Sequence, residues 1–114
     1  MKPISELIKD RKLHFVTKGT TIRKAAEYMN EHNIGLVPIL DTDSKLLGVF
    51  SERDMVRRVI SKNLDCNQIL VDEVMSTNLV FAGIEESYEA CIQKMKSKGT
   101  RHILILDNEK LVGI

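Results

Sequence analysis

Hydrophobic and polar positions in this chain alternate between short apolar runs and stretches with apolar residues at helical spacing. Residues 14–16 form a brief apolar run, and the glycine and two threonines at 19–21 interrupt it and offer a threonine N-cap. Apolar residues then return at helical spacing, at Ile22, Ala25, Ala26 and Met29. This pattern predicts a short strand at 14–16 and a helix from about residue 22 that ends at Asn33 or Gly35.

The segment that follows is typical of a β-hairpin. Residues 36–40 and 46–50 are apolar, and the turn-forming residues at 41–44 separate them. Pro38 has no backbone N–H to donate, so we expect it at a strand edge or where the ladder is already interrupted. A second helix is predicted to begin at Ser51, with one apolar face made of Met55, Val56, Val59 and Ile60.

The same pattern occurs twice along the chain. Residues 13–49 return as 79–114 with one turn residue lost, and Met29/Met95 and Gly48/Gly113 are among the identical pairs. The second copy predicts a helix from about Glu85 to Gly99. Its inward residues are predicted to be Tyr88, Cys91, Ile92 and Met95. Two long copies indicate a pair of similar units, because a solenoid needs three or more short repeats.

The domain organisation follows from this repeat. Ile114 corresponds to Val49, so equivalents of Ser51, Asp54 and the second helix are not in this sequence. We expect one α/β domain in which two pseudo-symmetric β-α-β-β-α units share apolar surface, because half of 114 residues makes a small core. The expected division is a lead-in at 1–12, a first unit at 13–62, a linker at 63–74 and a second unit at 75–114.

Composition limits which kinds of partner the chain is expected to bind. Seventeen basic and sixteen acidic residues give a net charge of +1, so no overall field attracts nucleic acid or an anionic membrane. No apolar run approaches the roughly 18 residues of a membrane span, and the start lacks a signal-peptide core, which predicts a cytoplasmic protein. Cys66 and Cys91 lack metal-ligand spacing, so we expect reduced thiols and no metal site.

The order of elements, with Val37-Pro38-Ile39-Leu40-Asp41 and then Gly48-Val49-Phe50-Ser51-Glu52-Arg53-Asp54, resembles a cystathionine-beta-synthase-type (CBS) domain. Two in tandem resemble a Bateman module, especially in the small stand-alone CBS-pair proteins of bacteria and archaea. The resemblance runs from about Leu13 to the end of the chain. It implies two units that pack through their sheets about a pseudo-two-fold axis, with two clefts for adenosine-type ligands.

Ser51 and Asp54 match the Ser/Thr-x-x-Asp pattern of that family. The resemblance implies that the hydroxyl reaches phosphate or ribose and that the carboxylate accepts hydrogen bonds from the ribose hydroxyls. Free N–H groups at a helix start also favour a phosphate. An alternative is that the pair forms a capping box, which stabilises a helix start without any ligand. Both interpretations remain open at the level of sequence.

The resemblance also places the second strand of the other unit opposite this helix start, which here means Thr100, Arg101 and His102. Arg101 is then the expected phosphate partner, and His102 adds a hydrogen bond or a charge. The family's segment before the first strand touches the base, which by register is Met75 to Leu79. The alternative for Arg101 is a solvated charge, and for His102 a residue satisfied within its own unit.

The opposite cleft is expected to be weaker. Its strand residues are Ile34, Gly35 and Leu36, which carry no charge where the second copy has Arg101 and His102. We therefore predict one good site and a second that takes a weaker or less phosphorylated ligand.

The function predicted from these residues is regulatory binding without catalysis. His14, His32 and His102 fall on separate predicted elements, and the sequence has no nucleophile elbow or Gly-rich phosphate loop. We expect no catalytic residue and no required cofactor. The predicted ligand is AMP, ADP, ATP or S-adenosylmethionine, and its occupancy is signalled through dimer geometry or an effector protein.

Two other function classes compete with this prediction. The first is a ligand-independent scaffold, because CBS pairs resemble one another in forming homodimers through their helices; the candidate contacts are Met29, Met55, Val59 and Met95. The second is nucleic-acid binding through Arg53, Arg57, Arg58, Lys62, Lys94, Lys98 and Arg101. Interleaved acids and the lack of aromatic stacking residues favour solvated helix faces over the second class.

Overall fold

The computed structural model describes residues 3–8, 12–100, 102–108 and 110–114. The chain forms two compact units, and the fold is α/β, as predicted. The first-repeat unit is His14–Asn78, and the second-repeat unit combines Met1–Leu13 with Leu79–Ile114. This grouping differs from a contiguous division at 63–74, because the lead-in segment joins the second repeat and the residues up to Asn78 join the first.

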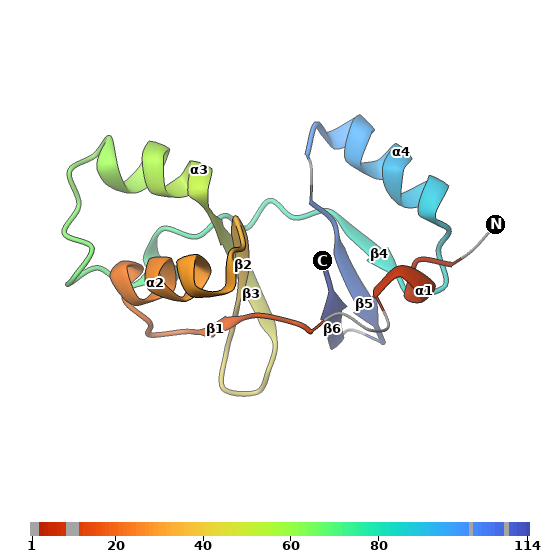
Figure 1. Ribbon diagram of the computed structural model, residues 1–114, viewed down its shortest axis with the longest axis horizontal. Coiled ribbons are helices and arrows are strands. Elements are labelled where there is room, and N and C mark those ends of the chain that lie inside the picture. Colours follow the sequence, from red (N-terminus) through yellow and green to blue (C-terminus); the bar gives the residue numbers. More distant parts are fainter. Residues whose placement is uncertain (1–2, 9–11, 101, 109) are drawn as a thin grey trace. The chain divides into compact units, whose positions relative to one another are not determined.

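The first-repeat unit contains a three-stranded sheet of order β1-β2-β3 (Figure 1). Strand β1 runs parallel to β2, and β2 pairs antiparallel with β3. The elements of this unit are β1 (Val16–Thr17), α2 (Ile22–His32), β2 (Leu36–Leu40), β3 (Leu46–Ser51), α3 (Glu52–Asp54), η1 (Met55–Ile60) and η2 (Val71–Glu73).

Helix α2 begins and ends where side chains satisfy its terminal groups. The Thr21 hydroxyl accepts a hydrogen bond from the Lys24 N–H, which caps the first turn. Asn33 adopts a left-handed conformation with φ of 53° and ends the helix, so the first of the two predicted end points is the observed one.

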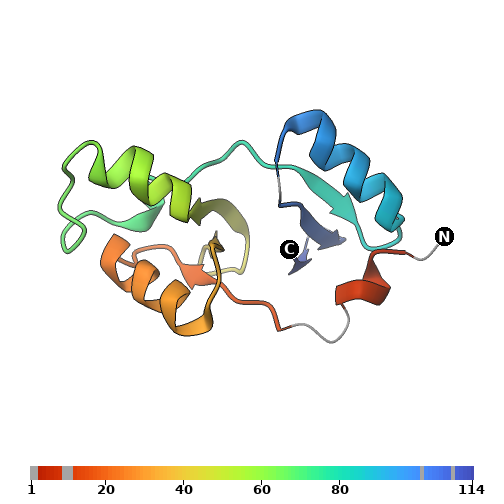
Figure 2. The same cartoon turned by 45° about the horizontal axis from the view of Figure 1, so that its top comes forward.

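The core of this unit lies between the helices and the sheet. Both ribbon views show α2 and α3 on the same side of the sheet (Figures 1 and 2). The residues buried there are Val16, Ile22, Ala25, Met29, Val37, Ile39, Phe50, Val59 and Val71. Methyl-bearing side chains therefore fill most of the core, as the scarcity of aromatic residues implies.

Pro38 lies in the central strand, opposite Val49 at a non-hydrogen-bonding position of the β2–β3 ladder and outside the residues that pair with β1. Its partner Val49 donates to and accepts from Ser76 instead of β2, at 2.9 and 2.8 Å. Strand β1 pairs only with Ile39 and Leu40. The missing N–H of the proline therefore costs no ladder hydrogen bond.

The predicted apolar face of the second helix is only partly correct. Val59 is fully buried, but Val56 and Ile60 are 62% and 67% exposed. The segment η1 is π-helical, and the N–H groups of Ser61 and Leu64 donate to carbonyls five residues earlier. The core contacts Met55 and Val59, which lie four positions apart, and leaves Val56 and Ile60, at the other edge of the predicted apolar face, exposed.

The second-repeat unit has the same topology, with a sheet of order β4-β5-β6. Its elements are α1 (Ser5–Ile8), β4 (Phe81–Gly83), α4 (Tyr88–Lys98), β5 (Leu104–Asp107) and β6 (Lys110–Gly113). Helix α4 begins at Tyr88, later than Glu85, because Ser87 is its N-cap; Gly99 ends it as predicted. Tyr88 is 44% exposed, so its predicted inward position is wrong.

The internal repeat extends into the predicted lead-in and linker segments. The Ile4 N–H donates to Glu86 O at 2.6 Å, and the Val71 N–H donates to Thr20 O at 2.7 Å, where Thr20 and Glu86 are equivalent positions. Residues 3–8 therefore dock on the second repeat as residues 70–75 dock on the first. Each repeat is completed by a segment that precedes the other repeat along the chain.

Candidate ligand site at the start of helix α3

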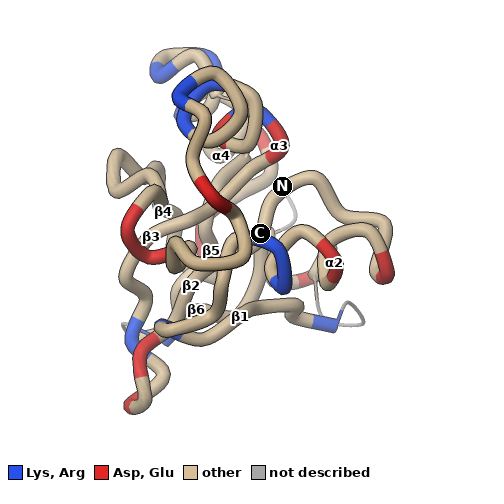
Figure 3. The backbone as a smooth tube through the Cα atoms, turned by 90° about the vertical axis from the view of Figure 1, so that its left-hand side faces the viewer, with Lys and Arg blue, Asp and Glu red and all other residues tan. Residues whose placement is uncertain are grey.

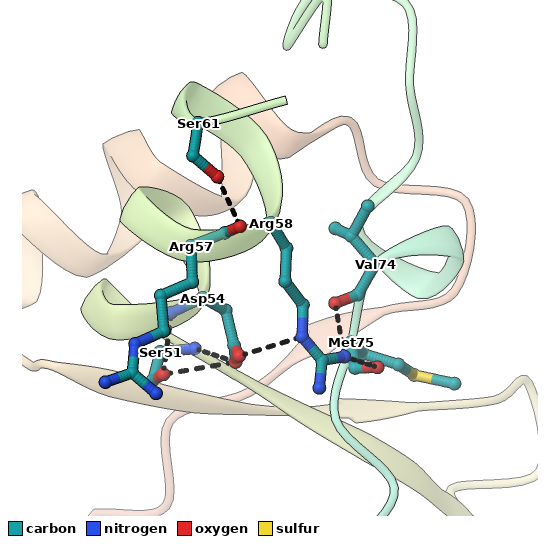
Figure 4. Close-up of polar contacts among 7 residues, drawn as sticks. All are labelled: Ser51, Asp54, Arg57, Arg58, Ser61, Val74 and Met75. Atoms are coloured by element: carbon teal, nitrogen blue, oxygen red, sulfur yellow. Dashed lines mark hydrogen bonds and ion pairs between the residues drawn. The ribbon is translucent and has the colours of Figure 1, made fainter. Parts of the chain in front are cut away.

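Ser51 and Asp54 lie where strand β3 passes into helix α3 (Figure 4). The Ser51 hydroxyl accepts a hydrogen bond from the Asp54 N–H at 3.2 Å. Asp54 Oδ2 accepts from the Ser51 N–H at 3.0 Å and from the Ser51 hydroxyl at 3.1 Å. The pair therefore forms a complete capping box, which confirms the structural interpretation of this motif. Their role in ligand binding stays a prediction.

Asp54 is nearly buried, at 9% exposure, and its second oxygen faces a cation. Arg58 Nε lies 3.5 Å from Asp54 Oδ1, one helical turn further along. Arg58 Nη1 also donates to the carbonyls of Val74 and Met75, at 3.4 and 3.1 Å (Figure 4). From the sequence, Arg58 is predicted only as a possible nucleic-acid contact, although an Asp and an Arg four residues apart on a helix often form an ion pair.

The segment that Arg58 contacts is fixed to the same unit by its own packing. Ser76 exchanges two backbone hydrogen bonds with Val49 in β3. The Met75 sulfur lies against Gly48, where an added Cβ would stand only 2.7 Å from it. Met75 and Ser76 therefore lie beside Gly48 and Val49 of β3. The contact of Met75 to Leu79 with the base of a ligand stays a prediction.

The residues predicted for the other side of the cleft belong to the second-repeat unit. Arg101 lies outside the described residues. The Thr100 hydroxyl accepts a hydrogen bond from the His102 N–H at 3.3 Å, and the His102 side chain is exposed. The convergence of Thr100, Arg101 and His102 with Ser51 and Asp54 stays a prediction.

Ile34, Gly35 and Leu36, predicted to line the weaker cleft, lie between α2 and the start of α3. The Gly35 carbonyl accepts from the Glu52 N–H at 3.0 Å, and the Glu52 carboxylate lies 3.5 Å from the Cβ position of Gly35. Ile34 and Glu52 line a groove of about 350 Å³. Although the strand itself has no charge, α3 places a carboxylate beside it, and a carboxylate disfavours a phosphate group nearby.

Two histidines predicted on separate elements come together. The rings of His14 and His32 lie 4.4 Å apart, and both contact the ring of Tyr28. Within the described residues there is no group of three or more His, Cys, Asp or Glu side chains that could hold a metal ion. Cys66 and Cys91 are free thiols, and burial raises the pKa of the Cys91 thiol.

The predicted dimer contacts need correction. Val59 is fully buried and Met29 is 6% exposed, so neither can supply an exposed contact. Both lie in the core because they face the sheet side of their helices. Val56 and Ile60 are the exposed apolar residues of η1, while Met55 and Met95 are half-buried.

Charge along the chain is mixed. Lys and Arg segments alternate with Asp and Glu segments in the backbone trace (Figure 3). This mixture agrees with solvated helix faces. None of the helices in the described part of the chain is both long and apolar enough to cross a membrane.

The two repeats share one topology and form a tandem module, and comparison with known proteins identifies its family. The CBS domain family model matches residues 4–61 and 71–114, and the chain belongs to this family. The CBS domain-containing protein YhcV of Bacillus subtilis is 36% identical over 99 residues, which are 87% of this chain and 69% of YhcV.

Solved structures show the same fold. An uncharacterised conserved protein from Pyrococcus horikoshii has a TM-score of 0.87 and 30% identity, covering 99% of this chain and 85% of its own. The CBS domain protein PAE2072 of Pyrobaculum aerophilum, solved with AMP, has a TM-score of 0.83 and 24% identity, with coverages of 98% and 85%. The CBS domain pair of MJ0100, solved with 5'-methylthioadenosine and S-adenosyl-L-methionine, has a TM-score of 0.86 and 21% identity, with coverages of 99% and 87%.

Proposed function

We propose that this CBS pair is a regulatory module that binds an adenosyl ligand through Ser51 and Asp54. The observation that carries the proposal is the Asp54 carboxylate, which is nearly buried, oriented by Ser51 and one turn into a helix. A carboxylate held in this way can accept hydrogen bonds from two vicinal hydroxyls. The AMP and S-adenosyl-L-methionine in structures of the same fold support the choice of ligand class.

The remaining contacts of the ligand come from the residues that the family resemblance names. Arg101 binds a phosphate through its forked donors, and Thr100 and His102 add hydrogen bonds. The cleft at Ile34, Gly35 and Leu36 takes a less phosphorylated ligand, because the Glu52 carboxylate lies beside Gly35. The module acts in the cytoplasm, without catalysis, and signals through the geometry of a homodimer or an effector protein.

A ligand-independent scaffold is the second candidate, and the exposed side chains of Val56 and Ile60 favour it. At 62% and 67% exposure, both residues offer apolar surface on η1 that a second copy of the chain would cover. This candidate keeps the dimer and needs no ligand at Asp54.

A pair of cap variants separates the proposed function from simple helix capping. Asp54→Ala removes the carboxylate, and Ser87→Ala removes the cap of α4, whose hydroxyl accepts from the Ala90 N–H at 3.1 Å. Both losses should cost about 0.5–2 kcal/mol of stability. Only Asp54→Ala should weaken the binding of AMP, ADP, ATP or S-adenosylmethionine, by more than about tenfold, which corresponds to about 1.4 kcal/mol.

Calorimetry measures the affinities, and thermal melting supplies a second reading. A ligand at about 100 times its dissociation constant should stabilise the wild type by about 2.7 kcal/mol. Equal affinity of Asp54→Ala and the wild type for these ligands would show that Asp54 serves only in the helix cap. If none of the four compounds shifts the melting temperature of the wild type, the scaffold becomes the better candidate.

A further inference from the structure

Only one oxygen of the Asp54 carboxylate is free to accept hydrogen bonds from a vicinal diol. A carboxylate offers about four lone-pair positions to donors, two on each oxygen. Hydrogen bonds from the Ser51 N–H and hydroxyl occupy Oδ2, at 3.0 and 3.1 Å. The Arg58 guanidinium forms an ion pair with Oδ1, with Nε 3.5 Å away. A diol brings two hydroxyl donors, and both must reach Oδ1, so the guanidinium beside it has to move aside when the diol binds.

Arg58 is the donor that leaves most easily. Its contact with Asp54 is the longest of the three, and its side chain is 47% exposed, so water can replace it at little cost. The two Ser51 donors are shorter and belong to the capping box that holds the start of α3. Losing either of them would weaken the cap of the first helical turn.

Arg58 also holds the segment by which the chain leaves this unit. Its Nη1 donates to the Val74 and Met75 carbonyls, at 3.4 and 3.1 Å. The Met75 carbonyl belongs to the same peptide unit as the Ser76 N–H, which donates to Val49 O at 2.8 Å. The chain enters the second-repeat unit at Leu79. One guanidinium therefore joins the candidate site to this connecting segment (Figure 4).

We propose that Arg58 is a positioning residue that relays the arrival of a ribose diol at Asp54 to the Met75–Ser76 peptide unit. The relay rests on the proposed function. The diol hydroxyls replace Arg58 on Oδ1, the guanidinium loses its anionic partner, and its hold on the two carbonyls weakens. Coupling between two sites is reciprocal. Diol binding therefore weakens the Arg58 contact by the same factor by which that contact weakens diol binding.

The test measures how variants at two neighbouring arginines, Arg58 and Arg57, bind two nucleosides. Arg58→Met keeps the apolar stem and removes the donors, whereas Arg58→Lys keeps a cation without the forked geometry. Arg57→Met is the matched control, because Arg57 is exposed on the same segment and its backbone carbonyl accepts from the Ser61 hydroxyl. The probes are adenosine and 2'-deoxyadenosine, which lacks one of the two hydroxyls. Calorimetry gives the affinities, and NMR gives the exchange rate of the Ser76 amide.

Adenosine should bind Arg58→Met about two- to fivefold more tightly than the wild type, which is the range that an exposed ion pair supplies. The affinity for 2'-deoxyadenosine should be equal in Arg58→Met and the wild type, because its single ring hydroxyl can reach Asp54 without displacing Arg58. Adenosine should speed Ser76 exchange in the wild type and in Arg57→Met by the same factor. In Arg58→Met and Arg58→Lys, exchange should be fast without ligand and should not respond to it.

The possible failures are distinct. Equal Ser76 exchange in ligand-free Arg58→Met and Arg57→Met would show that Arg58 does not hold the segment, which overturns the relay. Adenosine binding to the wild type without a change at Ser76, or weaker binding to Arg58→Met, would overturn the relay and leave the proposed function standing. If no adenosyl compound binds the wild type, the proposed function fails and the relay fails with it.

Discussion

Tyr28 and Lys94 occupy equivalent positions on α2 and α4, yet they make different contacts. Tyr28 lies among rings, with its hydroxyl 3.3 Å from His14 Nδ1 and its ring 4.3 Å from that of His32. Lys94 Nζ forms an ion pair with Glu86 at 2.7 Å and donates to the Phe81 carbonyl at 3.0 Å. In both units the contact joins the helix to the segment around the first strand. The fold requires a contact at this place, and different chemistries can supply it.

Other equivalent positions carry the same structural role in both repeats. Thr21 and Ser87 cap the two helices, and Asn33 and Gly99 end them in the left-handed conformation. These roles satisfy backbone groups that every helix leaves unpaired, so they are shared. The side chains between the caps are free to differ, and burial is one property in which they do.

The largest expected difference concerns Ile22 and its equivalent Tyr88. Ile22 is fully buried in a core cluster that includes Val59, whereas Tyr88 is 44% exposed. Ile22→Ala should lower the free energy of unfolding by about 2–5 kcal/mol, because it leaves a cavity. Tyr88→Ala should cost about 1 kcal/mol or less, as surface substitutions do. Urea unfolding followed by circular dichroism measures both, and equal losses would show that the two helices are buried alike.

Gly48 and Gly113 offer a finer comparison. A Cβ at Gly48 would stand 2.7 Å from the backbone oxygen of Ser76, whereas at Gly113 its nearest neighbour is the tip of the Ile8 side chain, at 2.8 Å. A side-chain tip can move aside, and a paired backbone cannot. Gly48→Ala should therefore cost about 1–3 kcal/mol, and Gly113→Ala less. Urea midpoints in the opposite order would contradict this reading of the two docked segments.

Much of the fold was predictable from the sequence because its signals are local and occur twice. Helical spacing around Ile22 and Cys91 and the hairpin turns gave the element order, and both copies agreed. The docking of residues 3–8 and 70–75 was not predicted, since both segments are short and pair with the distant repeat. The π-helical turn of η1 was missed for another reason, because its period differs from that of an α-helix.

The candidate site was predictable only in part. Ser51 and Asp54 belong to a compact motif, so their pairing could be found from spacing alone. The ion pair of Arg58 with Asp54 follows the same local rule. Its bonds to the Val74 and Met75 carbonyls join residues sixteen and seventeen positions apart, and no local pattern marks them.

The smallest expected effect concerns the ion pair that distinguishes Lys94 from Tyr28. Hydrogen bonds from Lys94 and the Gly83 N–H lower the pKa of the Glu86 carboxyl below its ordinary value of 4.5. A lowered pKa stabilises the folded chain at pH values above that of the unfolded carboxyl, and this contribution is lost as the pH falls through the folded value. Because the Lys94 side chain is 42% exposed, the pair should contribute only about 0.2–1 kcal/mol.

Glu86→Gln should therefore be less stable than the wild type at about pH 7. The difference should shrink as the pH falls below the range in which the unfolded carboxyl titrates and then through the lowered pKa of the folded carboxyl. Glu27→Gln is the matched control, because Glu27 is exposed on α2 and its equivalent in the second repeat is already Gln93. Urea unfolding across this pH range measures both. A difference for Glu86→Gln that persists at low pH would show that the carboxyl acts through packing or its bond to Gly83. Glu86 and Lys94 would then stabilise the second repeat through packing, as the rings around Tyr28 do in the first repeat.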